Sequence, residues 1–334
     1  MRSRLSFAVI IVSVVAAAVA HAQTVPLTAT PVALDPNDPA RLTVGRLVYR
    51  GGLILQSSDA RFGGWSDLHV SPDGVRVTAI SDRGYWFEAE LVHDASGRLI
   101  SLSHMSLGPL IDPAGRRIFG RNNDAEGLTT APDGGFYVSF EHNHRIWHYP
   151  RADRPFSVPP RPIPTPARLA AAPANGGIEA LLRLSDGRLL ALVEELRDGD
   201  ENVGWIADGP AWDELHYRAG SDFKPTGLAE MPAGTFAAGD VVVLERRLTF
   251  LSGWGARLVQ LRRADIRPGA HLEGQELAKL QLPLTVDNFE GVAAVRGADG
   301  SVRLYLISDD NYTILQRTIL MMFELPPPTD GRRP

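Results

Sequence analysis

The chain has 334 residues and a formal net charge of −5, with 44% hydrophobic and 22% charged residues. These values are ordinary for a globular protein, and the lack of a basic excess argues against nucleic acid as a partner. There is no cysteine, which excludes disulfides, thiolate metal ligands, a cysteine nucleophile and a lipidated N-terminal cysteine.

The first 22 residues predict a secretory signal peptide. Arg2 and Arg4 precede an apolar run over residues 5–20, and Ala20-His21-Ala22 fits a small-x-small cleavage site. The run is shorter than the roughly 20 residues that span a bilayer, which favours a cleaved leader over the alternative, an N-terminal membrane anchor. We therefore expect export to the periplasm or the exterior, without stable membrane insertion.

One pattern recurs five times in the rest of the chain. A small or acidic pair and an apolar residue lead into a turn, and an apolar strand that ends in a carboxylate follows the turn. The turns are Pro72-Asp73-Gly74, Pro132-Asp133-Gly134, Ser185-Asp186-Gly187, Pro232-Ala233-Gly234 and Asp299-Gly300. Such turns between apolar runs are typical of β-hairpins, and a single hairpin cannot bury its apolar face alone. The repeats must therefore stack on one another.

The spacing of the repeats predicts an all-β protein with the β-propeller fold. The intervals between Asp67 and Gly291 average 56 residues, near the roughly 40–50 residues of known blade repeats. We expect six four-stranded blades around a central channel. The sixth would be shared by strands at 47–56 and 318–325, whose pairing would close the ring. The expected domains are an extended segment at 23–43, the propeller at 44–325 and a disordered tail at 326–334.

Six motifs in chain order resemble those of the phytase-like family, whose members are described as having the esterase-like activity of phytase. The motifs are Ser81-Asp82-Arg83-Gly84, Ala125-Glu126-Gly127-Leu128, Asn175-Gly176-Gly177-Ile178-Glu179-Ala180-Leu181, Lys224-Pro225-Thr226-Gly227-Leu228, Asp287-Asn288-Phe289-Glu290-Gly291 and Ser308-Asp309-Asp310-Asn311. The resemblance runs over residues 44–325. It implies a propeller-type fold and hydrolysis of phosphate or other esters, and it assigns no catalytic residue.

Three glutamates occupy the same place in three repeats, at the start of the strand that should line the channel. Carboxylates that converge on one axis repel each other unless they are protonated or neutralised, and Ca²⁺ or Mg²⁺ favours oxygen ligands. The oxygen ligands predicted for a divalent cation, with Ca²⁺ preferred, are Glu126, Glu179, Glu290, Asp67, Asn288 and Asp309. In the alternative interpretation, the glutamates accept hydrogen bonds from the backbone of adjacent blades.

A second acidic column lies where the second strand of each repeat ends. Its members are Asp82, Glu141, Glu194, Glu245 and Asp309. Basic residues stand nearby, and a guanidinium group binds phosphate bidentately. The predicted substrate contacts are Arg83, Lys224, Arg246 and Asn311. The alternative for these cations is salt bridging between blades.

The predicted catalytic residues are Glu126, Glu290, Asp82 and His142. His142 is a candidate general base because its pKa is near neutral. On a strand, His142 and His144 would share one face and could bind Zn²⁺ together with Glu141. A hairpin bend with solvated histidines is the alternative.

Two classes of function remain open. The chain has no Gly-x-Ser-x-Gly elbow, no phosphate-binding loop that ends in Lys-Ser/Thr and no His-Glu-x-x-His, so the corresponding enzyme classes lack support. One candidate is a monomeric, metal-assisted hydrolase of small phosphate or other esters, or of lactones. The other is a non-catalytic propeller that binds a ligand or a protein partner, since fold alone does not decide function.

Overall fold

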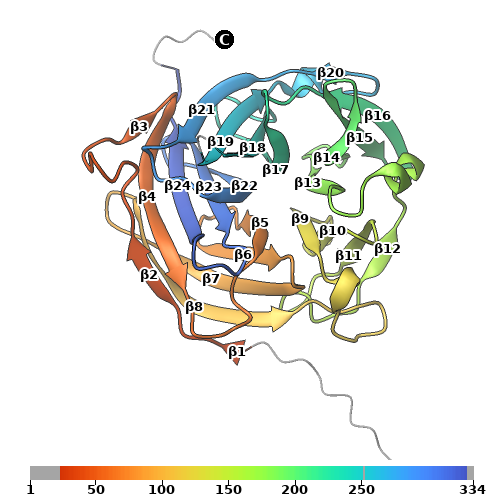
Figure 1. Cartoon of the computed structure of the whole chain (residues 1–334), viewed down its shortest axis with the longest axis horizontal. Coiled ribbons are helices and arrows are strands. Elements are labelled where there is room, and N and C mark those ends of the chain that lie inside the picture. The colour runs from red at the N-terminus through yellow and green to blue at the C-terminus, as the bar shows by residue number, and fades with distance from the viewer. Residues whose placement is uncertain (1–22, 251–252, 329–334) are drawn as a thin grey trace, which may run out of the picture.

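The computed structural model describes residues 23–250 and 253–328, so the expected signal peptide lies outside the described residues. The chain forms a β-propeller of five sheets around a central channel (Figure 1). The fold class is therefore confirmed, but the expected number of six blades is wrong. None of the described helices is both long and apolar enough to cross a bilayer.

Each of the first four sheets is built mainly from consecutive strands. The first holds β5 (Trp65–Val70), β6 (Arg76–Ser81), β7 (Tyr85–His93), β8 (Leu99–Pro109) and β1 (Gln23–Thr24). The second holds β9 (Ala125–Thr130), β10 (Phe136–Phe140), β11 (Arg145–Tyr149) and β12 (Arg161–Ile163). The third holds β13 (Ile178–Arg183), β14 (Leu189–Asp198), β15 (Glu201–Asp208), β16 (Ala211–Tyr217) and β20 (His271–Leu272). The fourth holds β17 (Lys224–Glu230), β18 (Val241–Thr249), β19 (Gly253–Leu261) and β21 (Gln275–Gln281).

The fifth sheet explains the error in blade number. It holds β22 (Asn288–Arg296), β23 (Val302–Asp309), β24 (Thr318–Leu325), β4 (Leu47–Gln56) and β2 (Thr28–Pro31), with β3 (Thr43–Val44) beside β4. β24 and β4 pair antiparallel, but they complete the fifth repeat and form no sixth blade. Three short 3₁₀ helices lie in connections: η1 (Gly120–Asn122), η2 (Ala167–Ala171) and η3 (Arg263–Asp265).

Apolar side chains are buried mainly between blades. Five hydrophobic clusters correspond to the five interfaces between neighbouring sheets. Where the fifth sheet meets the first, Trp65 packs edge-on against Phe87 at 4.6 Å between ring centroids, and both side chains are fully buried. Stacking of amphipathic hairpins thus provides the core that no single repeat could form.

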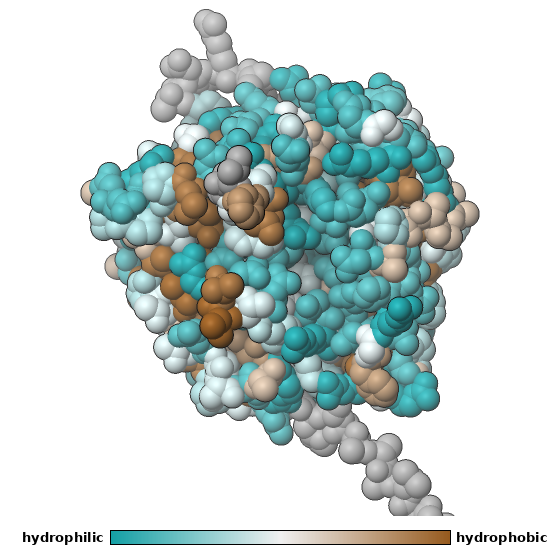
Figure 2. Space-filling model, in the orientation of Figure 1, coloured by the Kyte–Doolittle hydropathy of each residue, from teal (hydrophilic) through white to brown (hydrophobic). Residues whose placement is uncertain are grey.

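The face viewed in Figure 2 is mainly hydrophilic. Its hydrophobic side chains gather on the left of the view, over the sheets of β22–β24 and β18–β19 in Figure 1. The first strand of each repeat lies innermost, and β5, β9, β13, β17 and β22 contact one another in a closed ring. This ring surrounds the channel and positions the candidate site.

Candidate functional site at the channel mouth

A β-bulge near the start of every inner strand adds one residue to that strand. In four of the five hairpins the extra residue is single, as at Glu179, which stands between the pairs Ile178–Val193 and Ala180–Leu192. In the second, Glu126 and Gly127 oppose the single residue Ser139. The residues at the bulges are Ser66, Glu126, Glu179, Thr226 and Glu290. A bulge re-aims a side chain out of the ladder, so equivalent side chains are positioned at one end of the channel.

Small residues after the bulges allow the inner strands to approach closely. A Cβ atom on Gly127 would lie 2.8 Å from the Cβ of Leu181, and one on Gly291 would lie 2.7 Å from the Cα of Asp67. Asp67 itself is buried. Its Oδ2 accepts a hydrogen bond from the N–H of Leu128 at 2.7 Å, and its Oδ1 accepts one from the N–H of Leu68 at 2.8 Å. Asp67 therefore ties neighbouring blades together through the kind of backbone hydrogen bond that the alternative interpretation expected of the glutamates.

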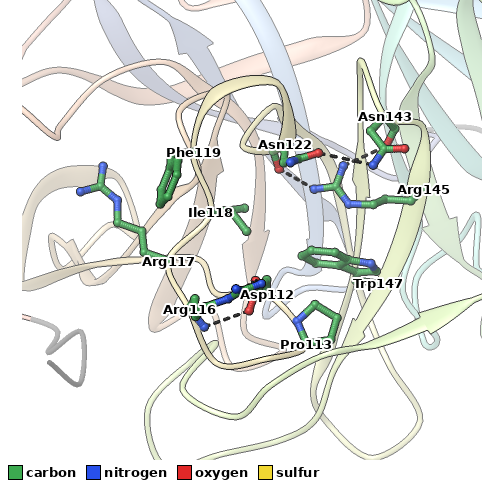
Figure 3. Close-up of a pocket in the computed structure, with 10 residues that line it drawn as sticks. All are labelled: Asp112, Pro113, Arg116, Arg117, Ile118, Phe119, Asn122, Asn143, Arg145 and Trp147. Atoms are coloured by element: carbon green, nitrogen blue, oxygen red, sulfur yellow. Dashed lines mark hydrogen bonds and ion pairs between the residues drawn. The ribbon is translucent and has the colours of Figure 1, made fainter. Parts of the chain in front are cut away.

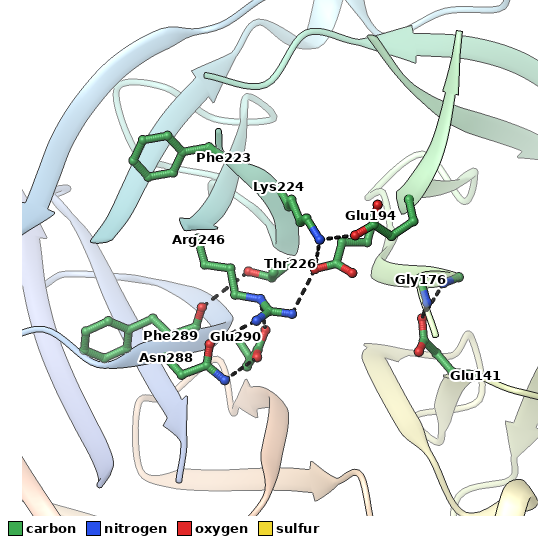
Figure 4. Close-up of polar contacts among 12 residues, drawn as sticks. Glu141, Gly176, Glu194, Phe223, Lys224, Thr226, Arg246, Asn288, Phe289 and Glu290 are labelled. Carbon is green, nitrogen blue, oxygen red and sulfur yellow. Dashed lines mark hydrogen bonds and ion pairs between the residues drawn. The ribbon is translucent and has the colours of Figure 1, made fainter. Parts of the chain in front are cut away.

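Arg246 neutralises one side of the channel mouth (Figure 4). Its guanidinium donates to Glu194 Oε1 at 2.9 Å and to Asn288 Oδ1 at 3.1 Å, and its Nε lies 3.0 Å from Glu290 Oε2. Asn288 in turn donates to Glu290 Oε1 at 2.7 Å. Burial lowers the pKa of Arg246, but the surrounding carboxylates, Glu290 first, raise it further, so that the side chain is firmly cationic. Arg246, Asn288 and Glu290 thus form a network among themselves.

Lys224 belongs to the same side. Its Nζ pairs with Glu195 and lies 3.6 Å from Glu194 Oε1. Glu179 is also close, since the charges of Glu194 and Arg246 both act on its pKa. Lys224 and Arg246, which were predicted to contact the substrate, therefore lie around Glu194. Glu179 and Glu290, which were predicted to bind the metal, lie there too.

The opposite side of the mouth holds a second acidic group with no such arginine. Ligand oxygens of Asp124, Glu126 and Glu141 lie within 4.8 Å of one another. Among the described residues, the one ion pair of this group joins Asp124 Oδ2 to His142 Nε2 at 3.1 Å. Glu141 Oε1 also accepts hydrogen bonds from the N–H groups of Gly176, at 2.6 Å, and Gly177. Three carboxylates thus converge where little positive charge is supplied.

Burial raises the pKa of the carboxyl groups at the mouth. For Glu126 the main cause is burial, followed by the charges of Glu179 and Asp124. The pKa of Glu179 is likewise raised well above its ordinary value, by burial and then by Glu194. Burial is also the first cause for the groups with smaller shifts, whose raised pKa values are about 7 for Glu141, about 8 for Asp82, about 8 for Glu290 and about 6 for Asp309. The mouth therefore retains protons at neutral pH or must acquire a cation.

The loops of the first and fifth blades meet beside this group. Asp309 Oδ1 accepts a hydrogen bond from the N–H of Asn311 at 2.6 Å, which fixes a turn in which Asn311 has φ +46°. The Arg83 guanidinium stacks 3.3 Å from the centroid of the Tyr312 ring and is exposed. Asp82 Oδ1 is buried and has no hydrogen-bond partner among the described residues. Arg83 and Asn311 remain predicted substrate contacts.

Two predicted histidine and carboxylate arrangements do not form. His142 and His144 lie in the turn between β10 and β11 and not on a strand, and His144 Nε2 contacts the carbonyl oxygen of Pro173 at 2.9 Å. Glu245 is fully buried away from the acidic group, where Tyr217 donates to it at 2.5 Å and Arg257 at 3.0 Å. The Zn²⁺ interpretation therefore fails, and Glu245 serves as a structural ion-pair partner.

Asp124 is the member of the site that the sequence analysis missed. It precedes the inner strand β9 and lies outside the repeat pattern, so no equivalent residue in other repeats marked it. A signal was nevertheless present, since Asp124 stands two residues before Glu126 and three further polar residues, Arg121, Asn122 and Asn123, precede it.

A cavity of about 450 Å³ lies between the loop that precedes β9 and strand β11 (Figure 3). It is lined by Asn122 and Asn143, which neighbour Asp124 and His142 in the chain, and by aromatic and basic side chains including Phe119, Arg117 and Trp147. Arg145 stacks over Trp147 at 4.3 Å, and burial lowers its pKa to about 10. The cavity could accommodate an organic anion beside the carboxylates.

The comparisons with known proteins identify the family. Similar solved structures include a gluconolactonase from Xanthomonas campestris, at 14% identity over 92% of this chain and 98% of that chain with a TM-score of 0.45. A PQQ-bound aldose sugar dehydrogenase from Streptomyces coelicolor is 14% identical over 82% of this chain and 97% of that chain, also with a TM-score of 0.45. No curated protein matches the chain. The family described as "Phytase-like: Esterase-like activity of phytase" matches residues 60–312, and the chain belongs to this phytase-like family.

Proposed function

We propose that the protein is an exported hydrolase that uses a divalent cation at the channel mouth to cleave small phosphate or other esters, lactones included. The observation that carries the proposal is the convergence of Asp124, Glu126 and Glu141 within 4.8 Å. No arginine or lysine forms an ion pair with these three among the residues that the structure describes. Carboxylate oxygens without a counter-charge suit a hard cation such as Ca²⁺ or Mg²⁺.

The donor set fits such an ion better than the originally expected one does. Glu179 and Glu290 lie around Arg246, whose charge already offsets theirs, and Asn288 Oδ1 accepts a hydrogen bond from the same guanidinium. Glu126 is therefore the ligand retained from the sequence prediction, and Asp124 and Glu141 are added to it. A bound cation would polarise an ester oxygen or lower the pKa of a water.

The protein groups around the cation would orient the reaction. Asp124 Oδ2 lies 3.1 Å from His142 Nε2, and a carboxylate partner fixes the orientation of an imidazole. His142 remains the candidate general base. The cavity of Figure 3 would hold the organic part of the ester between Phe119 and Trp147, and exposed Arg83 would attract an anionic substrate.

The test combines cation binding with turnover. Mature protein treated with EDTA is titrated calorimetrically with Ca²⁺, Mg²⁺ and Mn²⁺, and then assayed on p-nitrophenyl phosphate, p-nitrophenyl acetate and a simple lactone. We expect one saturable cation and activity that returns with it. Glu126→Gln keeps the volume of the side chain but removes its charge. It should weaken cation binding roughly 10–100-fold and abolish most turnover.

A matched control is available in the third blade. Asp198, Glu214 and His216 also bring three ligand atoms within 4.8 Å, but Arg168 pairs with both carboxylates there. Glu214→Gln should therefore leave cation binding and turnover unchanged. Binding without turnover on every ester would favour a non-catalytic propeller, and no effect of Glu126→Gln on either measurement would contradict the proposal.

A further inference from the structure

The channel has a second end with a different chemistry. A cavity of about 450 Å³ is lined by the last residues of all five inner strands, whereas the carboxylates lie at their first residues. Its walls are mainly apolar, with Leu68, Leu128, Leu228 and Val292 among them. Arg183 lies four residues after Glu179, and Arg296 lies six residues after Glu290. At about 3.3 Å per strand residue, roughly 13 and 20 Å of strand separate these arginines from the carboxylates, so the two groups belong to opposite ends of the channel.

Two guanidinium groups line this apolar cavity without a counter-charge. Arg183 ends β13 and Arg296 ends β22, on either side of β17. Neither side chain forms a hydrogen bond or an ion pair among residues 23–250 and 253–328. The acidic residue of the lining, Glu230, is occupied, because Arg263 Nη1 lies 2.7 Å from its Oε1.

The sequence repeat explains why Arg296 lacks a carboxylate partner. Four of the five turns at this end carry an aspartate, and each aspartate bonds within its own turn or to a neighbouring side chain or backbone N–H. The fourth turn has Ala233 in place of the aspartate. That turn lies against Arg296, since a Cβ atom on Gly234 would be 2.8 Å from Arg296 Nη1. The turn that Arg296 packs against is therefore the one that lacks the carboxylate of the repeat.

His69 adds no opposing or additional charge to the cavity. Burial lowers the pKa of its imidazole to about 4, so it is neutral at pH 7. An apolar cavity of this size with two cationic side chains in its lining fits the general form of a small-molecule site. Anionic headgroups bind guanidinium through charge-assisted hydrogen bonds, and the apolar wall would cover an attached hydrocarbon.

We propose that the end of the channel opposite the carboxylates is a binding site for small amphipathic anions, with Arg183 and Arg296 holding the anionic headgroup and the inner-strand leucines covering the apolar body. This site is independent of the proposed hydrolysis. It assigns a ligand to a place where the family resemblance assigned none.

The test uses a probe that the proposed hydrolase cannot cleave. Octane-1-sulfonate is titrated into the mature protein by calorimetry in EDTA, so that the acidic mouth carries no metal, and octan-1-ol and inorganic sulfate are titrated for comparison. We expect saturable binding of octane-1-sulfonate and much weaker binding of the other two. Equal binding of octan-1-ol would overturn the role of the arginines, and equal binding of sulfate would overturn the role of the apolar wall.

Variants separate charge from fold. Arg183→Gln and Arg296→Gln should each weaken the binding of octane-1-sulfonate roughly five- to tenfold, as expected for loss of a partly exposed charged hydrogen bond. Ala233→Asp restores the aspartate of the repeat at an exposed position and should weaken binding to a similar degree by pairing with Arg296. The exposed control Arg267→Gln should have no effect. Unchanged affinity in Arg183→Gln and Arg296→Gln, with unchanged melting temperatures, would refute the site.

Discussion

The two sides of the channel mouth solve the same electrostatic problem differently. Both sides place carboxylates close together. Glu194 and Glu290 share Arg246, whereas the one ion pair of Asp124, Glu126 and Glu141 within the described part of the chain joins Asp124 to His142. A buried charge needs a partner. The first side therefore has its partner within the chain and stabilises the ring, and the second side is free to take its partner from solution.

The largest effect should come from removing the internal partner. Arg246→Met removes the ion-pair partner of buried Glu290 and leaves Glu194 with Lys224 alone. We expect a loss of about 3–5 kcal/mol in the free energy of unfolding at pH 8, measured by urea denaturation. The loss should shrink at pH 5, where the carboxyl groups protonate. The neighbour Arg247 bonds to Gln281 at an exposed position, so Arg247→Gln should stay within about 0.5 kcal/mol of the wild type. Equal stability of Arg246→Met and wild type at pH 8 would remove the distinction between the two sides.

The next effect is the pH dependence of the metal-free protein. The pKa of Asp82 is raised to about 8 and that of Glu141 to about 7, in both cases by burial first. The folded state therefore binds more protons than the unfolded state between roughly pH 4 and 8, and its stability falls as pH rises through this window. Asp82→Asn should flatten the decline by about 2 kcal/mol between pH 5 and 8. Saturating Ca²⁺ should also flatten the decline of stability with pH. A stability that rises with pH would contradict the raised pKa values of Asp82 and Glu141.

A smaller effect compares one carboxylate from each side. Glu126→Gln should leave the free energy of unfolding of the metal-free protein unchanged or raise it by about 1 kcal/mol at pH 8, because it relieves repulsion. Glu194→Gln should lower it by about 1–2 kcal/mol, because it weakens the pair with Arg246. Both values come from chemical denaturation in EDTA. The same sign for both variants would show that the sides do not differ.

The smallest effect concerns the exposed cation at the mouth. Arg83→Gln loses stacking on Tyr312 and should cost about 0.5 kcal/mol of stability. If Arg83 contacts an anionic ester, KM should rise roughly a few fold with little change in kcat, because uniform binding is lost. Arg121→Gln, another exposed arginine, serves as the control. A fall in kcat at constant KM would exclude Arg83 from a binding role.

The hairpins were predictable because their turns are local. All five turns at Asp-Gly or its degraded form join two antiparallel strands, as expected. The blade number was not predictable from the interval of 56 residues, since long connections such as residues 150–173 contribute only β12 and η2. The number of residues that a connection places outside the sheets depends on tertiary packing, so the repeat interval does not give the blade number.

The site was predictable in position but not in pairing. The repeat placed Glu126, Glu179 and Glu290 around one axis, and Glu179 and Glu290 do lie around Arg246. Sequence alone could not show that Arg246 pairs with Glu194 and Glu290. Its contact with a substrate stays a prediction. Side-chain direction depends on the register shift beside each bulge, and a shift by one residue exchanges the two faces of a strand.

The five bulges also have an evolutionary consequence. The residue that each bulge adds lies outside the regular pairing, so its side chain can be exchanged without disturbing the hydrogen bonds that join the strands. Two of the five positions carry the hydroxyl residues Ser66 and Thr226 instead of a carboxylate. A lineage could therefore change the charge and chemistry of the mouth one blade at a time, while the scaffold that presents them stays the same.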